Sequence, residues 1–293
     1  MHRVAAILVT YNSARTVQSS VQSLIDHAPS DMPIVVVDNG SADDTQAIVG
    51  GFGDRVQLIV SPTNVGFGAG NNAGMRAVDA SFYYLHNADA YLNADSLQTA
   101  LAAMEADPAI GIAGLSLIYP DGRLQISAYA FSGPLKWTLQ LLRVQDIYRL
   151  VARGPLRPVL TGLAGRSSFG KSYAGIVSQE TTDTPLRVDW VTGAALLLSR
   201  AARDKTGGFD ESIFLYSEDE DLCRRVRAEH FDVVLVHNTP FVHELGWHAN
   251  KSSTGYSGIK FASKKVFIRK HFTGWRYAAM IALLRMKRAL NVD

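Results

Sequence analysis

The first 85 residues alternate between short, solidly apolar runs and segments whose apolar residues recur at helical spacing. The apolar runs cover residues 4–10, 34–37, 56–60 and 82–85. The first helical segment carries Val17, Val21 and Leu24 on one face. Strands without a polar face predict a parallel sheet that is buried on both sides. We therefore expect an α/β fold with a Rossmann-like, mostly parallel sheet and helices on both faces.

Polar clusters directly follow three of the predicted strands. They are Tyr11-Asn12, Asp38-Asn39 and Asn87-Ala88-Asp89. Ligands of open α/β sheets bind beyond the carboxyl ends of the strands. A carboxylate such as Asp89 at a strand end suits a divalent ion that also binds phosphates, although an Asx turn is the simpler alternative. Asp38 can likewise accept a hydrogen bond from a nucleotide or organise its own turn.

Four consecutive acids, Glu218 to Asp221, open a helical pattern that runs to Ala228. Ser217 and Glu220 have the spacing of a capping box, and the helix dipole favours acids at a helix N-terminus. Four adjacent carboxylates repel one another, however, and exceed that need. We expect one of them to act as a base toward an alcohol.

A histidine and a glycine-rich loop are two further candidates for a binding site. His243 follows a predicted strand at residues 233–236 and a loop that contains Pro240. Its imidazole can complete a metal site or form an ordinary hydrogen bond in the loop. Residues 64–72 open a helix with glycines whose amides can meet phosphate. Their spacing, and their place after the third strand, argue against a dinucleotide-binding oxidoreductase.

The middle of the chain is less regular. We expect a helix over residues 96–106, a strand over 110–117 and a hairpin around 120–122. Residues 131–187 show no clear pattern. Within them the Gly, Ser and Thr-rich stretch 162–184 has the composition of a lid over a binding site.

The net charge of +2 hides an asymmetry. From Lys260 onward there are nine basic residues and one acid, which leaves 20 basic and 26 acidic residues in the rest of the chain. Such a tail can meet nucleic acid, anionic lipid or a phosphorylated acceptor, or it can be a solvated helix pair. On a helical projection Arg285 and Arg288 lie away from Arg276, so we do not expect deep insertion into a membrane.

The single cysteine, Cys223, excludes an internal disulfide and is expected to pack as a small hydrophobe. A reducing compartment fits this cysteine usage. No apolar run approaches the roughly 20 residues that cross a bilayer, and the run at residues 4–9 is too short for a secretory signal. We expect a cytoplasmic protein.

Taken in order, the motifs resemble those of glycosyltransferase family two, which has the GT-A fold. The nearest branch is the rhamnosyltransferase-like one that builds bacterial cell-surface polysaccharides. The matching motifs are Val9 to Asn12, Val36 to Ser41, Asn64 to Gly74, Asn87-Ala88-Asp89, Trp190 to Ala194, Phe209-Asp210-Glu211, Glu218 to Arg225 and His243 to Gly246. They span residues 3–250. Ala88 stands where this branch often has proline.

The resemblance implies a role for each matching residue. The residues implied in donor binding are Thr10, Tyr11, Asn12, Asp38, Asn39, Asn64, Gly66, Asn71 and Asn87. Asp89 and His243 become ligands of Mn²⁺ or Mg²⁺, and Asp219 becomes the catalytic base. Trp190, Gly193 and Glu218 are implied on the acceptor side.

These roles imply an inverting, metal-dependent glycosyltransferase. The expected donor is dTDP-rhamnose and the acceptor a lipid-linked glycan, with no nucleic acid partner and with peripheral contact between residues 260–293 and anionic membrane. The alternatives are a UDP-sugar transferase, such as a galactofuranosyltransferase, and a non-catalytic carbohydrate-binding protein of the same fold. The chain would divide into a nucleotide-sugar-binding half (1–120), an acceptor-binding and catalytic half (121–250) and a basic helical tail (251–293).

Overall fold

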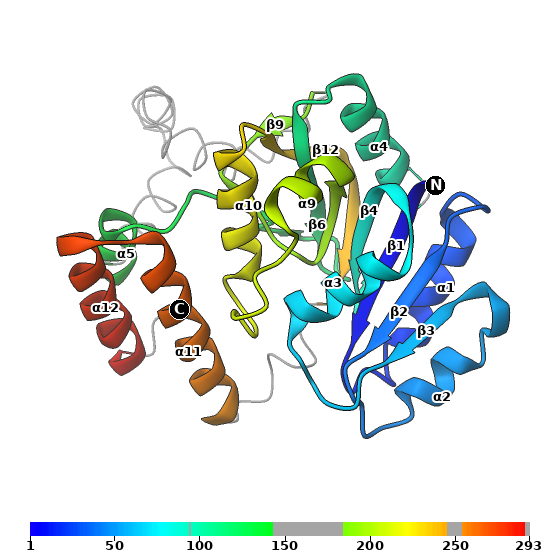
Figure 1. Ribbon diagram of the computed structural model, residues 1–293, viewed down its shortest axis with the longest axis horizontal. Coiled ribbons are helices and arrows are strands. Elements are labelled where there is room, and N and C mark those ends of the chain that lie inside the picture. Colours follow the sequence, from blue (N-terminus) through cyan, green and yellow to red (C-terminus); the bar gives the residue numbers. More distant parts are fainter. Residues whose placement is uncertain (94, 143–183, 245–253, 291–293) are drawn as a thin grey trace.

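The computed structural model describes residues 1–93, 95–142, 184–244 and 254–290 (Figure 1). The elements up to residue 106 are β1 (His2–Thr10), α1 (Val17–His27), β2 (Ile34–Asp38), α2 (Thr45–Gly50), η1 (Gly53–Arg55), β3 (Gln57–Val60), α3 (Phe67–Ala77), β4 (Ala80–Asn87), β5 (Ala90–Tyr91) and α4 (Ser96–Ala106). Those that follow are β6 (Ile110–Ile118), β7 (Leu124–Gln125), β8 (Ala128–Tyr129), α5 (Pro134–Leu141), β9 (Leu186–Arg187), β10 (Trp190–Val191), β11 (Ala195–Ser199), α9 (Arg200–Thr206), α10 (Glu218–Ala228), β12 (Asp232–His243), α11 (Thr254–His271) and α12 (Gly274–Ala289).

One large sheet, with strand order β3-β2-β1-β4-β11-β6-β12-β5, organises the molecule. Neighbours from β3 to β4 are parallel, and β6 and β12 are parallel to each other. β11 runs antiparallel between β4 and β6. The mostly parallel α/β sheet predicted from the apolar runs is therefore confirmed. The sheet is also continuous across residue 120, where the predicted halves meet.

Helices cover both faces of the sheet, as strand β1 shows. Successive side chains of a strand point to opposite faces. Val4, Ala6 and Leu8 pack into a core with α1, α2 and α4, whereas Ala5 and Ile7 pack into a second core with α3, α9 and α10. All five side chains are buried. Burial on both faces is why the run has no polar alternation.

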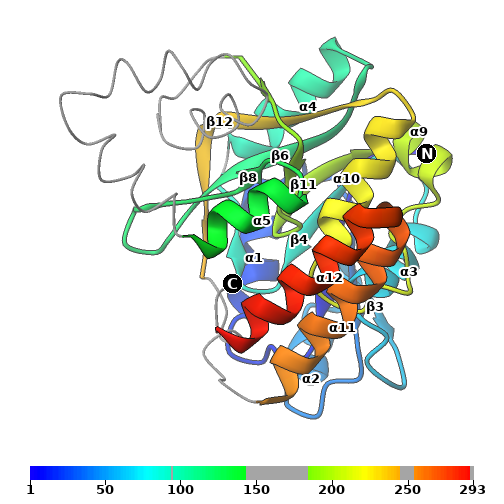
Figure 2. The ribbon, with the colours of Figure 1, turned by 90° about the vertical axis from the view of Figure 1, so that its left-hand side faces the viewer.

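A third core joins α5, α11 and α12, which lie side by side in Figures 1 and 2. It is built on Trp137, Phe267, Phe272 and Met280 and includes Ile213, from the segment that precedes α10. The helical tail expected from the sequence is present, and it packs against the body through this core. Within the described residues, no helix combines the length and the apolar character that crossing a membrane requires.

Two expectations around β6 and β12 have different outcomes. The hairpin is confirmed, because β7 pairs antiparallel with β6 and the Gly122 N–H donates to the Tyr119 carbonyl at 2.9 Å. The predicted loop between Val236 and His243 is wrong, since β12 continues through Pro240 to His243. The register of β12 with β6 shifts between Val236 and Phe241. Such an irregularity lets a strand accept a proline, which cannot donate to the ladder.

Candidate active site

Asp89 and His243 lie side by side where the short strand β5 pairs with the end of β12. His243 stands opposite Ala90 in that antiparallel pair, and the Glu244 N–H donates to the Asp89 carbonyl at 2.9 Å. The Asp89 Oδ1 and His243 Nε2 atoms are 3.3 Å apart. Their side chains are 18% and 10% exposed, so both can be reached by solvent.

This pair offers one carboxylate oxygen and one imidazole nitrogen. Among the described residues, no group of three His, Cys, Asp or Glu side chains could hold a metal ion. Mg²⁺ often takes only one or two carboxylate ligands from a protein and completes its shell with water and substrate phosphates. Imidazole also ligates divalent transition metals. The pair therefore fits a metal ion that is shared with a phosphorylated substrate.

Helix α10 begins at Glu218 as predicted, but the predicted capping box is wrong. Ser217 has a left-handed backbone with φ of 80°, and its side chain forms no capping hydrogen bond. Glu220 instead accepts hydrogen bonds from the N–H and the hydroxyl of Ser132, at 2.6 and 2.7 Å. It also pairs with Arg224 at 2.9 Å. A carboxylate that binds another segment cannot reach back to cap its own helix.

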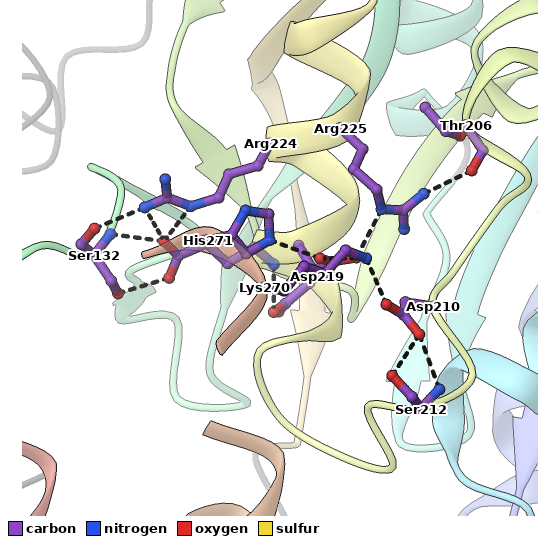
Figure 3. A network of polar contacts seen from close by, with 11 residues as sticks. Ser132, Thr206, Asp210, Ser212, Asp219, Arg224, Arg225, Lys270 and His271 are labelled. Carbon is purple, nitrogen blue, oxygen red and sulfur yellow. Dashed lines mark hydrogen bonds and ion pairs between the residues drawn. The ribbon is translucent and has the colours of Figure 1, made fainter. Parts of the chain in front are cut away.

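Asp221 is completely buried and faces three basic side chains. Arg225, Lys270 and His271 approach its oxygens at 2.8, 2.9 and 2.7 Å. Figure 3 shows Lys270 and His271, at the end of α11, reaching toward α10. Burial alone would raise the pKa of Asp221, but the hydrogen bond from His271 and the charge of Arg225 leave that pKa below its usual value. The network ties the tail to α10.

Glu218 and Asp219 have no such cations, since neither forms an ion pair within the described residues. Burial and the neighbouring Asp219 raise the pKa of Glu218 well above its usual value, and its Oε2 atom is buried without a hydrogen-bond partner in the described structure. Burial raises the pKa of the Asp219 carboxyl to about 6. The N–H groups of Glu220 and Gly193 oppose that rise by donating to Asp219 at 2.8 and 3.3 Å. A carboxyl with a pKa of about 6 is suited to exchange a proton near neutral pH.

A short segment before β11 brings Asp219 and the Asn87–Asp89 motif to the same end of the sheet. The Ala194 carbonyl accepts a hydrogen bond from the Asn87 N–H at 3.0 Å, while the adjacent Gly193 N–H donates to Asp219. Two consecutive residues thus bridge the end of β4 and the first turn of α10. The predicted acceptor residue Gly193 contacts the predicted base directly.

Trp190 is held in an aromatic stack that the sequence did not indicate. Its ring lies on that of Tyr129 with centroids 4.5 Å apart, and its Nε1–H donates to the Ala130 carbonyl at 3.0 Å. The Lys136 ammonium lies about 6 Å from both rings. Burial, with a smaller effect from the charge of Asp219, raises the pKa of Tyr129 to about 12. No motif marks Tyr129, and its only sequence signal is an aromatic residue shortly after the hairpin.

Asp38 differs from Asp219, because its carboxylate is fully buried and neighbouring groups already fill its hydrogen-bonding capacity. Its Oδ1 accepts from the Ser41 N–H at 2.9 Å and from the Gln46 amide at 2.8 Å. Its Oδ2 accepts from the hydroxyls of Thr10 and Ser41, at 3.0 and 2.5 Å. A carboxylate accepts about four hydrogen bonds. In this structure Asp38 organises the loops after β1 and β2, together with Thr10.

Asn12 belongs to the same network. Its N–H donates to the Ser41 hydroxyl and its Oδ1 accepts from the Ala42 N–H, both at 2.8 Å. Its backbone is left-handed, with φ of 50°, a conformation that asparagine tolerates better than most residues. Tyr11, between Thr10 and Asn12, is 37% exposed and is the member of this loop most open to a ligand.

The asparagines near the glycine-rich loop bind its backbone. Asn39 donates to the Gly66 carbonyl at 3.0 Å, Asn64 accepts from the Gly66 N–H at 2.9 Å, and Asn71 donates to the Phe67 carbonyl at 3.0 Å. The Gly66 amide is thus already engaged within the protein. Asn39 Oδ1, by contrast, is buried and has no partner in the described part of the chain.

Close packing accounts for glycine at two positions of this segment. A Cβ on Gly74 would lie 2.4 Å from the Ile7 side chain, so α3 could not sit so close to β1. Gly66 has φ of 94°, and a Cβ there would lie 2.5 Å from the Phe214 carbonyl oxygen.

Asn72, on α3, exchanges two hydrogen bonds of 2.9 Å with the backbone of Phe209. The Phe209-Asp210-Glu211 motif therefore joins α3 to the loop before α10.

The predicted lid cannot be compared with the structure, because residues 162–183 lie outside the described residues.

Sequence comparison identifies the family. The model of the family described as Glycosyl transferase family 2 matches residues 5–156, which is more than half of the chain. The N-acetylglucosaminyl-diphospho-decaprenol L-rhamnosyltransferase of Mycobacterium tuberculosis is 26% identical over 298 residues, covering 97% of this chain and 90% of the relative. The Rhizobium meliloti succinoglycan biosynthesis protein ExoO is 32% identical, but over only 41% of this chain and 35% of its own length.

Solved structures support the same fold. The mannosyltransferase PcManGT from Pyrobaculum calidifontis, in complex with GDP-Man and Mn²⁺, has a TM-score of 0.59 at 16% identity and covers 99% of this chain and 70% of its own. S. aureus TarS 1–349 in complex with UDP-GlcNAc has a TM-score of 0.57 at 14% identity, with coverage of 99% and 73%. These neighbours have the GT-A fold. The chain belongs to glycosyl transferase family 2 and is a glycosyltransferase with the GT-A fold.

Proposed function

We propose that the protein is a metal-dependent, inverting glycosyltransferase that acts on a lipid-linked glycan, with dTDP-rhamnose as the donor to test first. Residues 1–120 would bind the nucleotide sugar, residues 121–250 would supply the acceptor site and the base, and residues 251–293 would form a basic tail. One observation carries the proposal. A carboxylate and an imidazole lie 3.3 Å apart at the sheet edge, and the segment Gly193-Ala194 links that edge to Asp219.

In this mechanism Asp219 accepts the proton of the acceptor hydroxyl while that oxygen attacks the anomeric carbon. Attack from the face opposite the diphosphate inverts the configuration and needs no covalent enzyme intermediate. Asp89 and His243 would hold Mn²⁺ or Mg²⁺, which when bound supplies positive charge opposite the leaving diphosphate. The N–H groups of Gly193 and Glu220 donate to the Asp219 carboxylate and hold it in place.

The donor half of the proposal rests on the loops after β1 and β2. Tyr11 is 37% exposed, and Asn39 has a buried acceptor oxygen that the described residues leave without a partner. These loops would be held in place by Thr10, Asn12 and Asp38. The backbone next to them would be held by Asn64, Gly66, Asn71 and Asn87. Gly193 donates to Asp219, and Glu218 precedes Asp219 in α10, so both residues favour the acceptor side. Trp190 is assigned to that side because it stacks on Tyr129, whose pKa the charge of Asp219 helps to raise.

The sugar is proposed from the relatives. The mycobacterial relative is named as an L-rhamnosyltransferase that acts on N-acetylglucosaminyl-diphospho-decaprenol, so its acceptor is lipid-linked. A UDP-sugar donor, such as UDP-galactofuranose, is the second candidate. The relatives therefore define a short panel of donors.

The deciding experiment measures release of nucleoside diphosphate from dTDP-rhamnose, UDP-galactofuranose, UDP-GlcNAc and GDP-mannose. Each donor is tested with a lipid-linked acceptor in Mn²⁺, in Mg²⁺ and after chelation. We expect release from one donor, its loss on chelation, and its loss in the Asp89→Ala and Asp219→Asn variants. Asp121→Asn is the matched control, because Asp121 is an exposed turn residue paired with Arg123.

Release that survives both chelation and Asp89→Ala would contradict the metal dependence. Binding of a glycan without release from any donor would instead support a carbohydrate-binding protein. The stereochemistry of the product, read by NMR, decides whether the transfer inverts.

We further propose that the tail contacts anionic membrane. On α12 Trp275 and Met286 are exposed, and so are Leu135 on the adjacent α5 and Leu142 directly after it. Arg276 and Arg285 on α12 are also exposed, and each basic residue near anionic lipid contributes about 1 kcal/mol. The exposed apolar side chains and the arginines therefore lie on or next to two helices that pack together.

A vesicle assay tests the tail without deleting it, because α11 also holds α10 through Lys270 and His271. The double variant Arg276→Gln/Arg285→Gln should bind phosphatidylglycerol vesicles less than the wild type does, and neither should bind phosphatidylcholine vesicles. The control carries Arg55→Gln and Lys205→Gln, which remove the same charge from exposed positions elsewhere. Equal binding by the two double variants would contradict a contact through the tail.

A further inference from the structure

Gln125 lies behind the candidate metal site and reaches it from a separate strand. It ends the short strand β7, which folds back on β6 after the turn at residues 119–123. Its side chain is buried at 6% exposure, in contact with His243 at the end of β12. None of the family motifs in the sequence includes this residue.

The hydrogen bonds of Gln125 define which way its amide group points. Its Nε2 donates to the backbone carbonyl of His243 at 2.5 Å and, more weakly, to the carbonyl of Ile118 at 3.4 Å. Both partners can only accept, so the amide cannot be flipped without losing them. The Oε1 atom is therefore the one that faces His243 Nδ1, at 2.9 Å.

This orientation determines where the histidine proton lies. An amide oxygen only accepts, so Nδ1 must carry the hydrogen of the neutral ring. The lone pair then resides on Nε2, the atom that lies 3.3 Å from Asp89 Oδ1. Hydrogen bonds from the second nitrogen of a histidine commonly select the tautomer and ring orientation in metal sites.

We propose that Gln125 is a positioning residue that holds His243 with Nε2 directed at Asp89, ready to bind the metal ion. The inference rests on the proposed function, because it needs a metal at the Asp89–His243 pair. It adds a residue with no role in the family motifs of this chain. Gln125 itself stays behind the ring and touches neither donor nor acceptor.

The first test measures Mn²⁺ affinity by electron paramagnetic resonance of the free ion, with Mn²⁺ alone and with dTDP or UDP. Removing such an outer partner typically weakens metal binding about 10–100-fold, and we expect this for Gln125→Leu. Gln125→Glu keeps an acceptor for Nδ1–H but loses the donor to the carbonyls of His243 and Ile118, so it should recover part of the affinity. Gln22→Leu, at an exposed position on α1, is the matched control.

Nucleotide affinity without metal separates positioning from general damage. It should be unchanged in Gln125→Leu if the variant is folded and only the metal ligand is disturbed. Equal Mn²⁺ affinity in Gln125→Leu and the wild type, with binding lost in Asp89→Ala, would overturn the positioning role and leave the metal site standing. No Mn²⁺ binding by the wild type, alone or with either nucleotide, would overturn the metal site and this proposal together.

A second measurement needs no variant. Long-range ¹H–¹⁵N correlation spectra distinguish the two neutral tautomers of a histidine, and at alkaline pH His243 should show the proton on Nδ1. A proton on Nε2 in the wild type would overturn the proposal.

Discussion

The loops after β1 and β2 and the first turn of α10 both gather carboxylates, yet they treat them in opposite ways. Asp38 is buried and its two oxygens accept four hydrogen bonds from neighbouring groups. Asp219 receives only backbone N–H groups, and Glu218 beside it keeps an unpartnered oxygen in the described structure. A fully bonded carboxylate stabilises a loop, whereas an incompletely bonded one retains capacity for a substrate.

The same contrast divides α10 itself. Glu220 and Asp221 are neutralised by cations and tie the helix to Ser132 and to the end of α11. Their neighbours Glu218 and Asp219 have no ion-pair partner among the described residues. The four acids therefore separate into a pair that anchors the helix and a pair that no described cation neutralises.

The largest expected effect comes from the unanchored pair. Asp219→Asn keeps the shape of the side chain but removes the proposed base, and general base catalysis is typically worth 10²–10⁴-fold in rate. We expect kcat to fall by about that factor. Donor affinity and the unfolding midpoint should stay close to those of the wild type. Calorimetric titration of the donor and thermal unfolding check these two controls.

A loss of activity in Asp219→Asn that is matched by loss of fold or donor binding would break the contrast. Asp219 would then be an anchor like Asp221.

The anchoring pair should instead dominate stability. Asp221→Ala leaves the cations around it without their buried counter-charge, and removing one partner of a buried ion pair typically costs 3–5 kcal/mol. We expect a decrease of about that size in the free energy of unfolding by urea. The control Asp121→Ala breaks an exposed pair with Arg123 and should leave stability close to that of the wild type. A small effect at Asp221 would mean that the network contributes little to holding α10.

Substitution of Asp38 should have a smaller effect on stability, together with an equal loss of affinity for different nucleotides. Asp38→Asn turns one oxygen into an N–H₂ group that faces donors, and leaving buried groups unsatisfied costs about 1–3 kcal/mol. We expect lower stability and weaker binding of dTDP, UDP and GDP alike, because the loops that frame the site loosen. Binding constants for the three nucleotides are the measurement. A change in preference among the bases, without loss of stability, would show that Asp38 reads the base directly.

Local pattern was enough to predict most of the sheet and the helix at Glu218, since apolar runs and helical spacing depend on neighbouring residues. Which acids are neutralised was not predictable. The partners of Asp221 at Lys270 and His271 are 49 and 50 residues away, and Ser132 is 88 residues from Glu220. Only the folded chain brings these groups together.

The same limit explains the two errors near the site. The capping-box prediction is wrong because the Glu220 carboxylate accepts hydrogen bonds from the distant Ser132 and not from the N–H at the helix terminus. The prediction of a loop before His243 is wrong because pairing with β6 extends strand β12 beyond the apolar run. The roles assigned to the site residues from the family resemblance stay predictions, and the variants above test them.

The last prediction concerns pH and again turns on the contrast between Asp219 and its anchored neighbours. Burial raises the pKa of Asp219 to about 6, so the base becomes protonated at higher pH than an ordinary aspartate would. Because only the ionised form accepts a proton, kcat/KM should be level at neutral pH and should fall as pH drops through about 6. The charge of Glu220 adds to the raised pKa, so Glu220→Gln should move this fall to lower pH. Profiles are recorded at saturating Mn²⁺ so that metal loss does not imitate the effect. Because kcat/KM reports the ionisation of the free enzyme, a fall centred near the ordinary aspartate value would contradict a raised pKa of Asp219 and break the contrast.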